Sequence, residues 1–373
     1  LLVQSLASLE NRPLGFEPAG RLVFSTQLAK SSAASSNPAV ALTLQQTLLQ
    51  RLRALPGVRA AAASSMLPLE GQGNLPAEDA LAPNQSIGSV EVRMVSPGYF
   101  TAMGIPLVAG RDLSGSDTGA APLVTVVNEA LAHAWFRNRP VGGQIRIGMY
   151  HGKAYMPSAI TATRSVVGVV GDVRTRSLVQ PFQMAMYVPV AQLPMSVSMG
   201  SWFVVQGKVG AGPLRAAVAA VEPGARVSQM QPYSEVVTQL LGLPRFAAQL
   251  TAGFALLALL LTAVGLYGLL AYSVTERTRE IGVRMALGAP RGRLLGQVAG
   301  RGMLLAVIGV GAGVGFSLPL GKLIASVVFG VRTDDPATLA GAALALLVIA
   351  FIACLGPALR ATRVDAASAL RAE

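Results

Sequence analysis

Residues 254–274 read FALLALLLTAVGLYGLLAYSV, and residues 276–293 read ERTREIGVRMALGAPRGR. The first stretch belongs to a run of 30 uncharged residues, 246–275. At about 1.5 Å per residue, a helix of this length exceeds a hydrocarbon core of about 30 Å. The second stretch carries five arginines and two glutamates. Together they predict a membrane-spanning helix followed by a charged loop.

Two further uncharged runs follow this loop. One has 20 residues between Arg301 and Lys322, and the other has 24 between Asp335 and Arg360. The first can continue beyond Lys322 if that side chain extends towards the headgroups. We expect three spans, at about 247–274, 302–328 and 337–359. The alternative, buried helices of a large soluble core, rarely leaves three charge-free runs of this length.

The overall composition agrees with a membrane protein. The chain is 52% hydrophobic and only 13% charged, with a net charge of +12. The arginine-rich stretch contains no aromatic residue that could stack on bases, so we expect no nucleic-acid partner. The single cysteine, Cys354, lies in an apolar run, which excludes an intrachain disulfide and gives no information about the compartment.

The basic residues of the loops predict the orientation. Six arginines follow the first span and three lie in the C-terminal tail, whereas the middle loop has two basic residues offset by two aspartates. Since Lys and Arg are retained on the cytoplasmic side, loop 276–301 and the C-terminus are expected in the cytoplasm. Residues 1–244 would then form an extracytoplasmic domain, and residues 245–373 the membrane domain.

Residues 1–244 show alternating signals for helices and strands. The patterns predict a helix at 42–55 and a strand at 58–64, and then a loop at about 68–88 and a strand at 90–95. Ser96 is expected to cap a short helix with Pro97 in its first turn, and residues 110–122 form a surface loop. Residues 123–136 change from strand to helix at the cap Asn128. Further strands are expected at 164–173, 184–190 and 201–207, and a helix at 212–224. This order favours an α+β or split βαβ arrangement over a doubly wound sheet.

A search for catalytic motifs finds none. The sequence contains no phosphate-binding P-loop, no HExxH, no GxSxG and no cysteine pair. His133 and His151 lie apart and belong to no catalytic or metal-binding motif, so both are interpreted as ordinary polar residues. We expect no catalytic residue, no metal and no cofactor.

Two glycine-rich stretches resemble nucleotide-binding loops only superficially. GVGAGVG at 309–315 lies inside an apolar run, where small-xxx-small pairs permit close helix packing in a bilayer. These pairs are Gly309 with Gly313 and Gly311 with Gly315. VVGVVGDV at 166–173 is interpreted as a strand that passes close to another backbone.

The charged stretch itself has a helical pattern. Glu280 lies four residues before Arg284, and Gly288 with Pro290 is a helix-ending signal. One interpretation is a basic loop that rests on anionic membrane lipid. Paired glutamates weaken lipid attraction, however, and favour docking into an acidic, partly apolar groove of a cytoplasmic protein.

Several segments resemble one known family. ALLALLLTAVGLYGLLAYSVTERTREIGVRMALGA (255–289), VVFGVRTDDPATL (327–339) and PALRATRVDAASALRAE (357–373) are similar to the FtsX-like permease domain of MacB-type ABC transporters. LPGVRAAAASSMLPLEG (55–71), VSPGYFTAMGIPLVAGRDL (95–113), VVNEALA (126–132) and SVVGVVGDVR (165–174) resemble the MacB-like extracytoplasmic domain. The resemblance is strongest to the acidobacterial type of duplicated permease. The tail departs mildly, with Asp365-Ala366 where relatives commonly have Asp-Pro.

The resemblance implies a permease subunit of a bacterial inner membrane that couples ATP hydrolysis by a separate cytoplasmic subunit to movement of the extracytoplasmic domain. The coupling segment would be residues 276–289. Its expected contacts with the ATPase are Glu276, Arg277, Arg279, Glu280, Arg284 and Leu287. The extracytoplasmic domain would divide into a porter-like region, 19–90 plus 201–243, and an inserted region, 91–200.

The resemblance also implies partners. These are an ATPase subunit, membrane lipid, a second copy or a duplicated half, and a periplasmic adaptor. The family has a span ahead of the extracytoplasmic domain, so the sequence is expected to be a fragment or one half of a duplicated permease. The expected cargo class is peptides, drugs or lipid-linked molecules for efflux or export. The alternative function is a membrane-anchored scaffold or regulator that binds a periplasmic partner without energy coupling.

Overall fold

The computed structural model divides the chain into two compact units. The α+β unit comprises Arg12–Leu241, and the helical unit comprises the described residues from Gly242 onward. The structure describes residues 12–29, 32–70, 73–82, 86–136, 139–156, 158–175, 177–178, 180–198, 200–276, 291–325 and 336–361. Each unit is described by itself.

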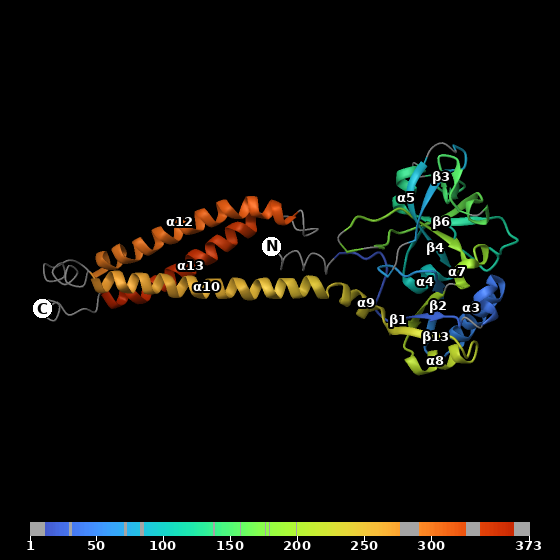
Figure 1. Ribbon diagram of the computed structural model, residues 1–373, viewed down its shortest axis with the longest axis horizontal. Coiled ribbons are helices and arrows are strands. Elements are labelled where there is room, and N and C mark those ends of the chain that lie inside the picture. Colours follow the sequence, from blue (N-terminus) through green and yellow to red (C-terminus); the bar gives the residue numbers. More distant parts are fainter. Residues whose placement is uncertain are drawn as a thin grey trace, which may run out of the picture. The chain divides into compact units, whose positions relative to one another are not determined.

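A four-stranded antiparallel sheet forms one half of the α+β unit (Figure 1). Its strands, in spatial order, are β2 (Val58–Ser64), β12 (Ser201–Gly207), β1 (Arg21–Gln27) and β13 (Arg226–Pro232). Along the chain, α3 (Pro38–Ala54) connects β1 to β2, and α8 (Ala211–Ala219) connects β12 to β13. Because β12 lies between β1 and β2, this is a split βαβ arrangement.

Both faces of this sheet are covered. On one face, Phe24 of β1 and Phe203 of β12 pack with Leu52 of α3 and Leu214 of α8. On the other face, β1 and β13 contact α9 (Tyr233–Leu240), and β2 and β12 contact α4 (Tyr99–Met103). The α9 helix therefore packs on the sheet immediately before the chain enters the helical unit.

A closed six-stranded barrel is inserted between β2 and β12. Its strands are, in order around the barrel, β4 (Ser86–Val95), β11 (Ala185–Pro189), β6 (Val124–Asn128), β10 (Arg164–Val170), β7 (Gln144–Ile147) and β3 (Asn74–Asp79), which pairs with β4 again. Two of the pairings, β10–β6 and β11–β4, are parallel. Side chains such as Val92, Val127, Ile145 and Met186 form its core.

Among the described strands, the barrel and the sheet pair with each other where β2 and β4 end. Ser64, the last residue of β2, pairs with Val95, the last residue of β4. The Ser96 hydroxyl accepts a hydrogen bond from the amide of Ala63 at 2.9 Å, and Ser65 donates its amide to Met94 at 2.8 Å. The ends of the two strands are therefore tied together by both backbone and side-chain bonds.

The remaining elements of the α+β unit are short. They are α2 (Ala33–Ser36), β5 (Leu107–Gly110, paired with β10), α5 (Glu129–Trp135), the hairpin β8 (Met149–Tyr150) and β9 (Lys153–Ala154), α6 (Ser158–Thr161), the 3-10 turn η1 (Val190–Gln192) and α7 (Met195–Ser198).

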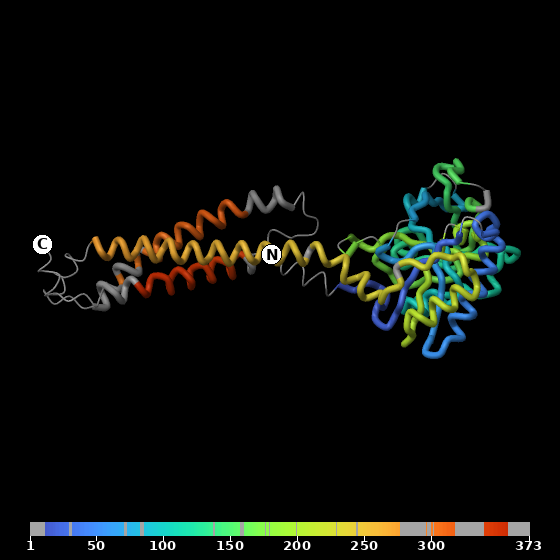
Figure 2. The backbone as a smooth tube through the Cα atoms, turned by 60° about the horizontal axis from the view of Figure 1, so that its bottom comes forward, coloured from blue at the N-terminus to red at the C-terminus, as the bar shows by residue number. Residues whose placement is uncertain are grey.

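The helical unit contains three long helices, α10 (Gly242–Glu276), α12 (Arg291–Ala325) and α13 (Pro336–Ala361). Figures 1 and 2 show α13 running beside both α10 and α12, and these two pairs make most of the contacts. Arg245–Glu276 and Leu339–Gly356 are long and apolar enough to cross a membrane, whereas the apolar part of α12, Gly302–Ser317, is shorter. Among the described residues, two helices therefore qualify as spans, where the sequence predicted three.

Several predictions for the α+β unit are confirmed. The strands at 58–64 and 201–207 have the predicted bounds, and the Asn128 side chain caps α5 by accepting a hydrogen bond from the amide of Leu131. The α+β class and the split βαβ arrangement are also correct. The predicted helix at 42–55 begins earlier, at Pro38, because Asn37 caps it.

Two predictions are wrong. The segment 68–88 is not all loop, because it contains β3 and the start of β4. Ser96 does not cap α4, whose N-cap is Gly98 with a φ of 81°. The Ser96 hydroxyl accepts from Ala63 at the junction of the two strand groups instead.

Candidate functional site

The predicted coupling segment begins where α10 ends. Glu276 is the last residue of α10. The other predicted ATPase contacts, Arg277, Arg279, Glu280, Arg284 and Leu287, lie outside the described residues. Their role stays a prediction.

The glycine pairs of α12 have open space beside them in the described part of the chain. A Cβ added at Gly309, Gly311, Gly313 or Gly315 would meet nothing within 4 Å. Gly309 and Gly313 line an apolar cavity of about 700 Å³ between the three helices, together with Gly265 of α10 and Leu346 of α13. Whether these glycines pack against a helix in the bilayer stays a prediction.

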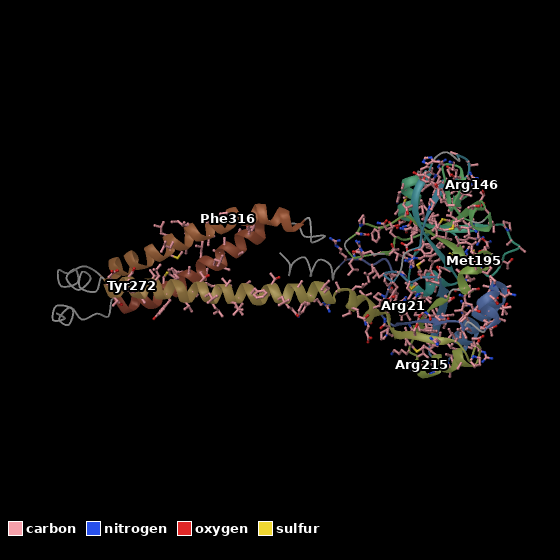
Figure 3. The ribbon with its side chains drawn as sticks, viewed as in Figure 1. Arg21, Arg146, Met195, Arg215, Tyr272 and Phe316 are labelled. Carbon is pink, nitrogen blue, oxygen red and sulfur yellow. The ribbon has the colours of Figure 1, made fainter. Side chains whose placement is uncertain are left out.

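Close packing within the helical unit occurs at a glycine that the sequence analysis did not single out. A Cβ at Gly302 of α12 would lie 2.6 Å from the Cys354 sulfur of α13 and 2.9 Å from a methyl group of Leu270 of α10. Cys354 and Leu270 are both buried. Gly302 therefore lies where all three helices meet. Side chains elsewhere on these helices are mostly exposed. Figure 3 shows that these side chains consist mainly of carbon.

A buried ion pair lies on β4, in the α+β unit. The Arg93 Nε donates to Glu91 Oε1 at 2.8 Å, and its Nη2 contacts the same oxygen. Arg93 Nη1 donates to the carbonyl of Met66 at 3.1 Å, in the segment between β2 and β3. Burial alone would lower the pKa of Arg93, but the neighbouring Tyr99 and Glu91 outweigh burial and raise it. The guanidinium is thus kept charged inside the protein.

Buried aromatic side chains surround this ion pair. The ring of Phe100 meets that of Tyr187 edge-on with centroids 4.9 Å apart, and Tyr99 lies 6.2 Å from Tyr187. Burial raises the pKa of Tyr99, Tyr187 and Tyr233. These phenols are therefore neutral at physiological pH. The cluster connects α4, β4, β11 and the start of α9.

The hairpin β8–β9 is held to the barrel by a second buried carboxylate. Glu78 of β3 is fully buried, forms an ion pair with Arg146 at 2.8 Å and accepts the amide of Gly152 at 3.0 Å. His151, at the hairpin turn, has a φ of +49°, and its ring lies 4.3 Å from that of Tyr150. Figure 3 shows Arg146 and Arg215 at opposite ends of the α+β unit, on the barrel and on α8 respectively.

The two histidines lie apart from each other in the described part of the α+β unit. Within the described ranges, no group of three or more His, Cys, Asp or Glu side chains is arranged to hold a metal ion. His151 is exposed at its turn, and His133 lies near Asp172. Asp172 accepts bonds from Asn128 at 2.7 Å and from the amide of Ala130 at 2.8 Å, and burial raises its pKa.

One glycine prediction is confirmed. A Cβ at Gly168 of β10 would lie only 2.2 Å from the carbonyl oxygen of Arg111, so VVGVVGDV is a strand against which another backbone packs closely. The sequence analysis missed Arg93, Glu91 and Glu78. Charged residues inside an otherwise apolar alternating strand were the available signal, since such residues are rarely buried unless paired.

Comparisons with known proteins agree with these two units. Residues 9–232 match the MacB-like periplasmic core domain, and residues 252–366 match the FtsX-like permease C-terminal region. The chain is 23% identical to the ABC transporter permease YknZ of Bacillus subtilis over 351 residues, which cover 91% of this chain and 82% of that one. It is 40% identical to the macrolide export ATP-binding/permease protein MacB of Neisseria meningitidis over 106 residues, 28% of this chain and 15% of that protein.

A solved structure, the periplasmic region of MacB from Actinobacillus actinomycetemcomitans, aligns with a TM-score of 0.40 at 14% identity. The alignment covers 63% of this chain and 98% of that one. The two family matches together account for most of the chain, on either side of the boundary between its structural units. The protein therefore belongs to the family of ABC transporter permeases that combine a MacB-like periplasmic core domain with an FtsX-like permease region.

Proposed function

We propose that this protein is the permease subunit of an ABC-type transporter or mechanotransmission complex. In this role, ATP hydrolysis by a separate cytoplasmic subunit moves the MacB-like domain. The main support is the continuity of the chain: α9 packs on the sheet of the α+β unit, and after the single residue Leu241 the chain continues as the 35-residue helix α10. In this proposal, a displacement of α10 reaches α9 through the chain itself.

The proposed topology follows the distribution of arginines. Residues 1–244 are extracytoplasmic, and loop 276–301 and the C-terminus are cytoplasmic in a bacterial inner membrane. We propose α12 as a third span despite its shorter apolar stretch, because Lys322 can extend to the headgroup region. The glycines at 309, 311, 313 and 315 would then face a helix of a second copy or of a duplicated half.

The proposed division of the MacB-like domain is a porter-like part, 19–90 plus 201–243, and an inserted part, 91–200. The strand pairing suggests a refinement of this proposal. Since β3 and all of β4 belong to the closed barrel, the inserted part would begin near Asn74, and the porter-like part would be the four-stranded sheet with its helices.

For cargo, we propose efflux or export of small molecules, peptides or lipid-linked compounds. The Neisseria relative supports an export role, since it is a macrolide export protein. A periplasmic adaptor would be the partner that continues the path.

The test addresses the charged segment. Candidate ATPase subunits are co-expressed with the full chain, and binding and ATP turnover in membranes are compared for wild type, Glu280→Lys and Arg284→Glu. We expect each reversal to weaken ATPase binding by about thirtyfold or more, since truncating one partner of a docked charge pair costs about 2 kcal/mol or more. Arg215→Glu on α8 is the matched control, because it reverses an exposed arginine of the α+β unit.

Two outcomes would contradict the proposal. If binding and turnover are the same in the reversal variants and in wild type, the segment does not couple the subunits. If no ATPase binds but the MacB-like domain retains a periplasmic partner irrespective of nucleotide, the protein is a membrane-anchored scaffold.

A further inference from the structure

The two ends of the α+β unit meet at one buried aromatic contact. Phe16, near its start, stacks on Tyr233, the first residue of α9, with ring centroids 5.0 Å apart. Tyr233 is fully buried and Phe16 is 6% exposed. The residue that opens the connection to α10 is thus packed against the N-terminal segment of the same unit.

Tyr233 also binds the segment that leads from the sheet into the barrel. Its hydroxyl donates to the carbonyl of Pro68 at 2.8 Å. The next residue, Leu69, has a φ of +67° and donates its amide to the carbonyl of Thr175 at 2.9 Å, beyond β10 of the barrel. A leucine in this left-handed region is strained and persists only where its surroundings hold it.

The N-terminal segment, which Tyr233 contacts through Phe16, also packs against the segment that follows β10 of the barrel. Leu14 accepts the amide of Arg174 at 2.9 Å, and a Cβ at Gly15 would lie 1.8 Å from the carbonyl oxygen of Asp172. Both Asp172 and Arg174 follow β10 directly. Glu17 donates its amide to Met103 of α4 at 3.0 Å. Tyr233 is therefore linked to the barrel in two ways. Its ring stacks on Phe16 of the N-terminal segment, and its hydroxyl is bonded to Pro68.

We propose that Tyr233 and Phe16 are coupling residues, which transmit a displacement of α9 to the junction between the four-stranded sheet and the barrel. This inference rests on the proposed function, in which α10 is the moving element. In the alternative, Tyr233 is merely a core residue of the α+β unit. Two observations favour coupling. The backbone of Leu69, next to Pro68, is strained. Tyr233 also contacts Phe16 and Pro68, which lie on connecting segments and not on paired strands.

Hydrogen–deuterium exchange on the full chain in lipid nanodiscs tests the proposal without any ATPase. Tyr233→Phe keeps the ring stack and removes the bond to Pro68, whereas Tyr233→Ala removes both. The reporters are the bonded amides of Ser65, Leu69 and Glu70, together with those of α9. Phe24→Leu is the matched control, because Phe24 stacks on Phe203 at 5.2 Å and is fully buried in the core between the sheet and α3.

In Tyr233→Phe, we expect exchange to rise about tenfold at Leu69 and Glu70 as well as in α9, the factor that corresponds to losing one net hydrogen bond. Tyr233→Ala should give a larger rise at the same amides. β1, β12 and α3 should keep their wild-type rates in both variants. Phe24→Leu should give the reverse pattern, with faster exchange in β1, β12 and α3 and wild-type rates at Leu69.

Two results would overturn the inference. In one, the tyrosine variants change exchange in α9 alone, which would show that α9 and the Pro68 segment move independently. In the other, they speed exchange across the whole α+β unit by one common factor, as expected of a core residue. Because no ATPase is present, either result counts against the coupling residues and leaves the test of ATPase docking unaffected.

Discussion

Arg93 and Glu91, two positions apart on β4, form an ion pair whose side chains are 0% and 1% exposed. Residues at i and i+2 of a strand point to the same face, so both charges lie on the face of β4 opposite to Val92 of the barrel core, where Arg93 meets the Met66 carbonyl. Such a pair needs its full set of partners, because an uncompensated charge in this environment is strongly unfavourable.

The first prediction tests whether the charges of Glu91 and Arg93, and not only the volume of their side chains, determine stability. Glu91→Ala should destabilise the protein by about 3–5 kcal/mol, since it leaves the Arg93 charge without its carboxylate. The double variant Glu91→Leu with Arg93→Met should recover most of that loss, because it removes both charges and retains volume. Thermal unfolding of the full chain in detergent measures both. Equal losses in the single and double variants would show that the side-chain shapes, and not the charges, matter here.

The second prediction concerns the close approach of two backbones. Gly168→Ala should destabilise the protein by about 1–3 kcal/mol, because the new Cβ would meet the Arg111 carbonyl and force the backbone to shift. Gly115→Ala is the control, since a Cβ there meets nothing within 4 Å, and it should change stability by less than about 0.5 kcal/mol. Unfolding midpoints of the two variants give the comparison. If the two are alike, β10 can move away from the segment at Arg111 at little cost.

How much of this could be predicted from the sequence depends on whether the determinant is local. Asn128 was identified as a cap and Gly168 as a close approach because each acts on its immediate backbone neighbours. The strand β1 was missed because its neighbours in the sheet, β12 and β13, lie about 180 residues or more further along the chain. The barrel was missed for the same reason, since its closure depends on the pairing of β4 with β11.

The candidate functional residues were likewise predictable only where a local pattern of the sequence marks them. Runs of arginine and of uncharged residues predict membrane helices and a charged loop from the sequence alone, because these predictions depend only on charge and length. The contact of Phe16 with Tyr233 has no such signal, since neither residue lies in a periodic or charged pattern that involves the other. Only the folded chain brings these two residues together.

The third prediction tests the place where the three long helices meet. Gly302→Ala should lower the unfolding temperature in detergent, because its Cβ would lie 2.6 Å from the Cys354 sulfur. Adding Cys354→Ala should restore part of the loss, since it removes the sulfur that the new methyl group meets. Gly341→Ala, on α13, is the control with open space around its Cβ. If Cys354→Ala gives no rescue in the Gly302→Ala background, the contact between α12 and α13 differs from the one described.

The fourth prediction is a pH dependence at the loop 110–122. Arg111 donates to both carboxylate oxygens of Asp117, at 2.8 and 2.9 Å, and lowers the pKa of Asp117 below its ordinary value of 3.8. A lowered carboxyl pKa stabilises the folded state above the ordinary pKa, and this contribution is lost as the pH falls through the folded value. Arg111→Gln should therefore cost about 0.5–1 kcal/mol near neutral pH, a modest value because the arginine side chain is half exposed.

The difference between Arg111→Gln and wild type should shrink as the pH falls below about 4 and the carboxylate is protonated in both proteins. Unfolding temperatures measured from about pH 7 down to about pH 3 check this, with Arg215→Gln on α8 as the control that should show no such convergence. A difference that stays constant across this range would mean that Arg111 stabilises the loop through its bond to the Asp112 carbonyl, at 3.0 Å, and not through the charge of Asp117.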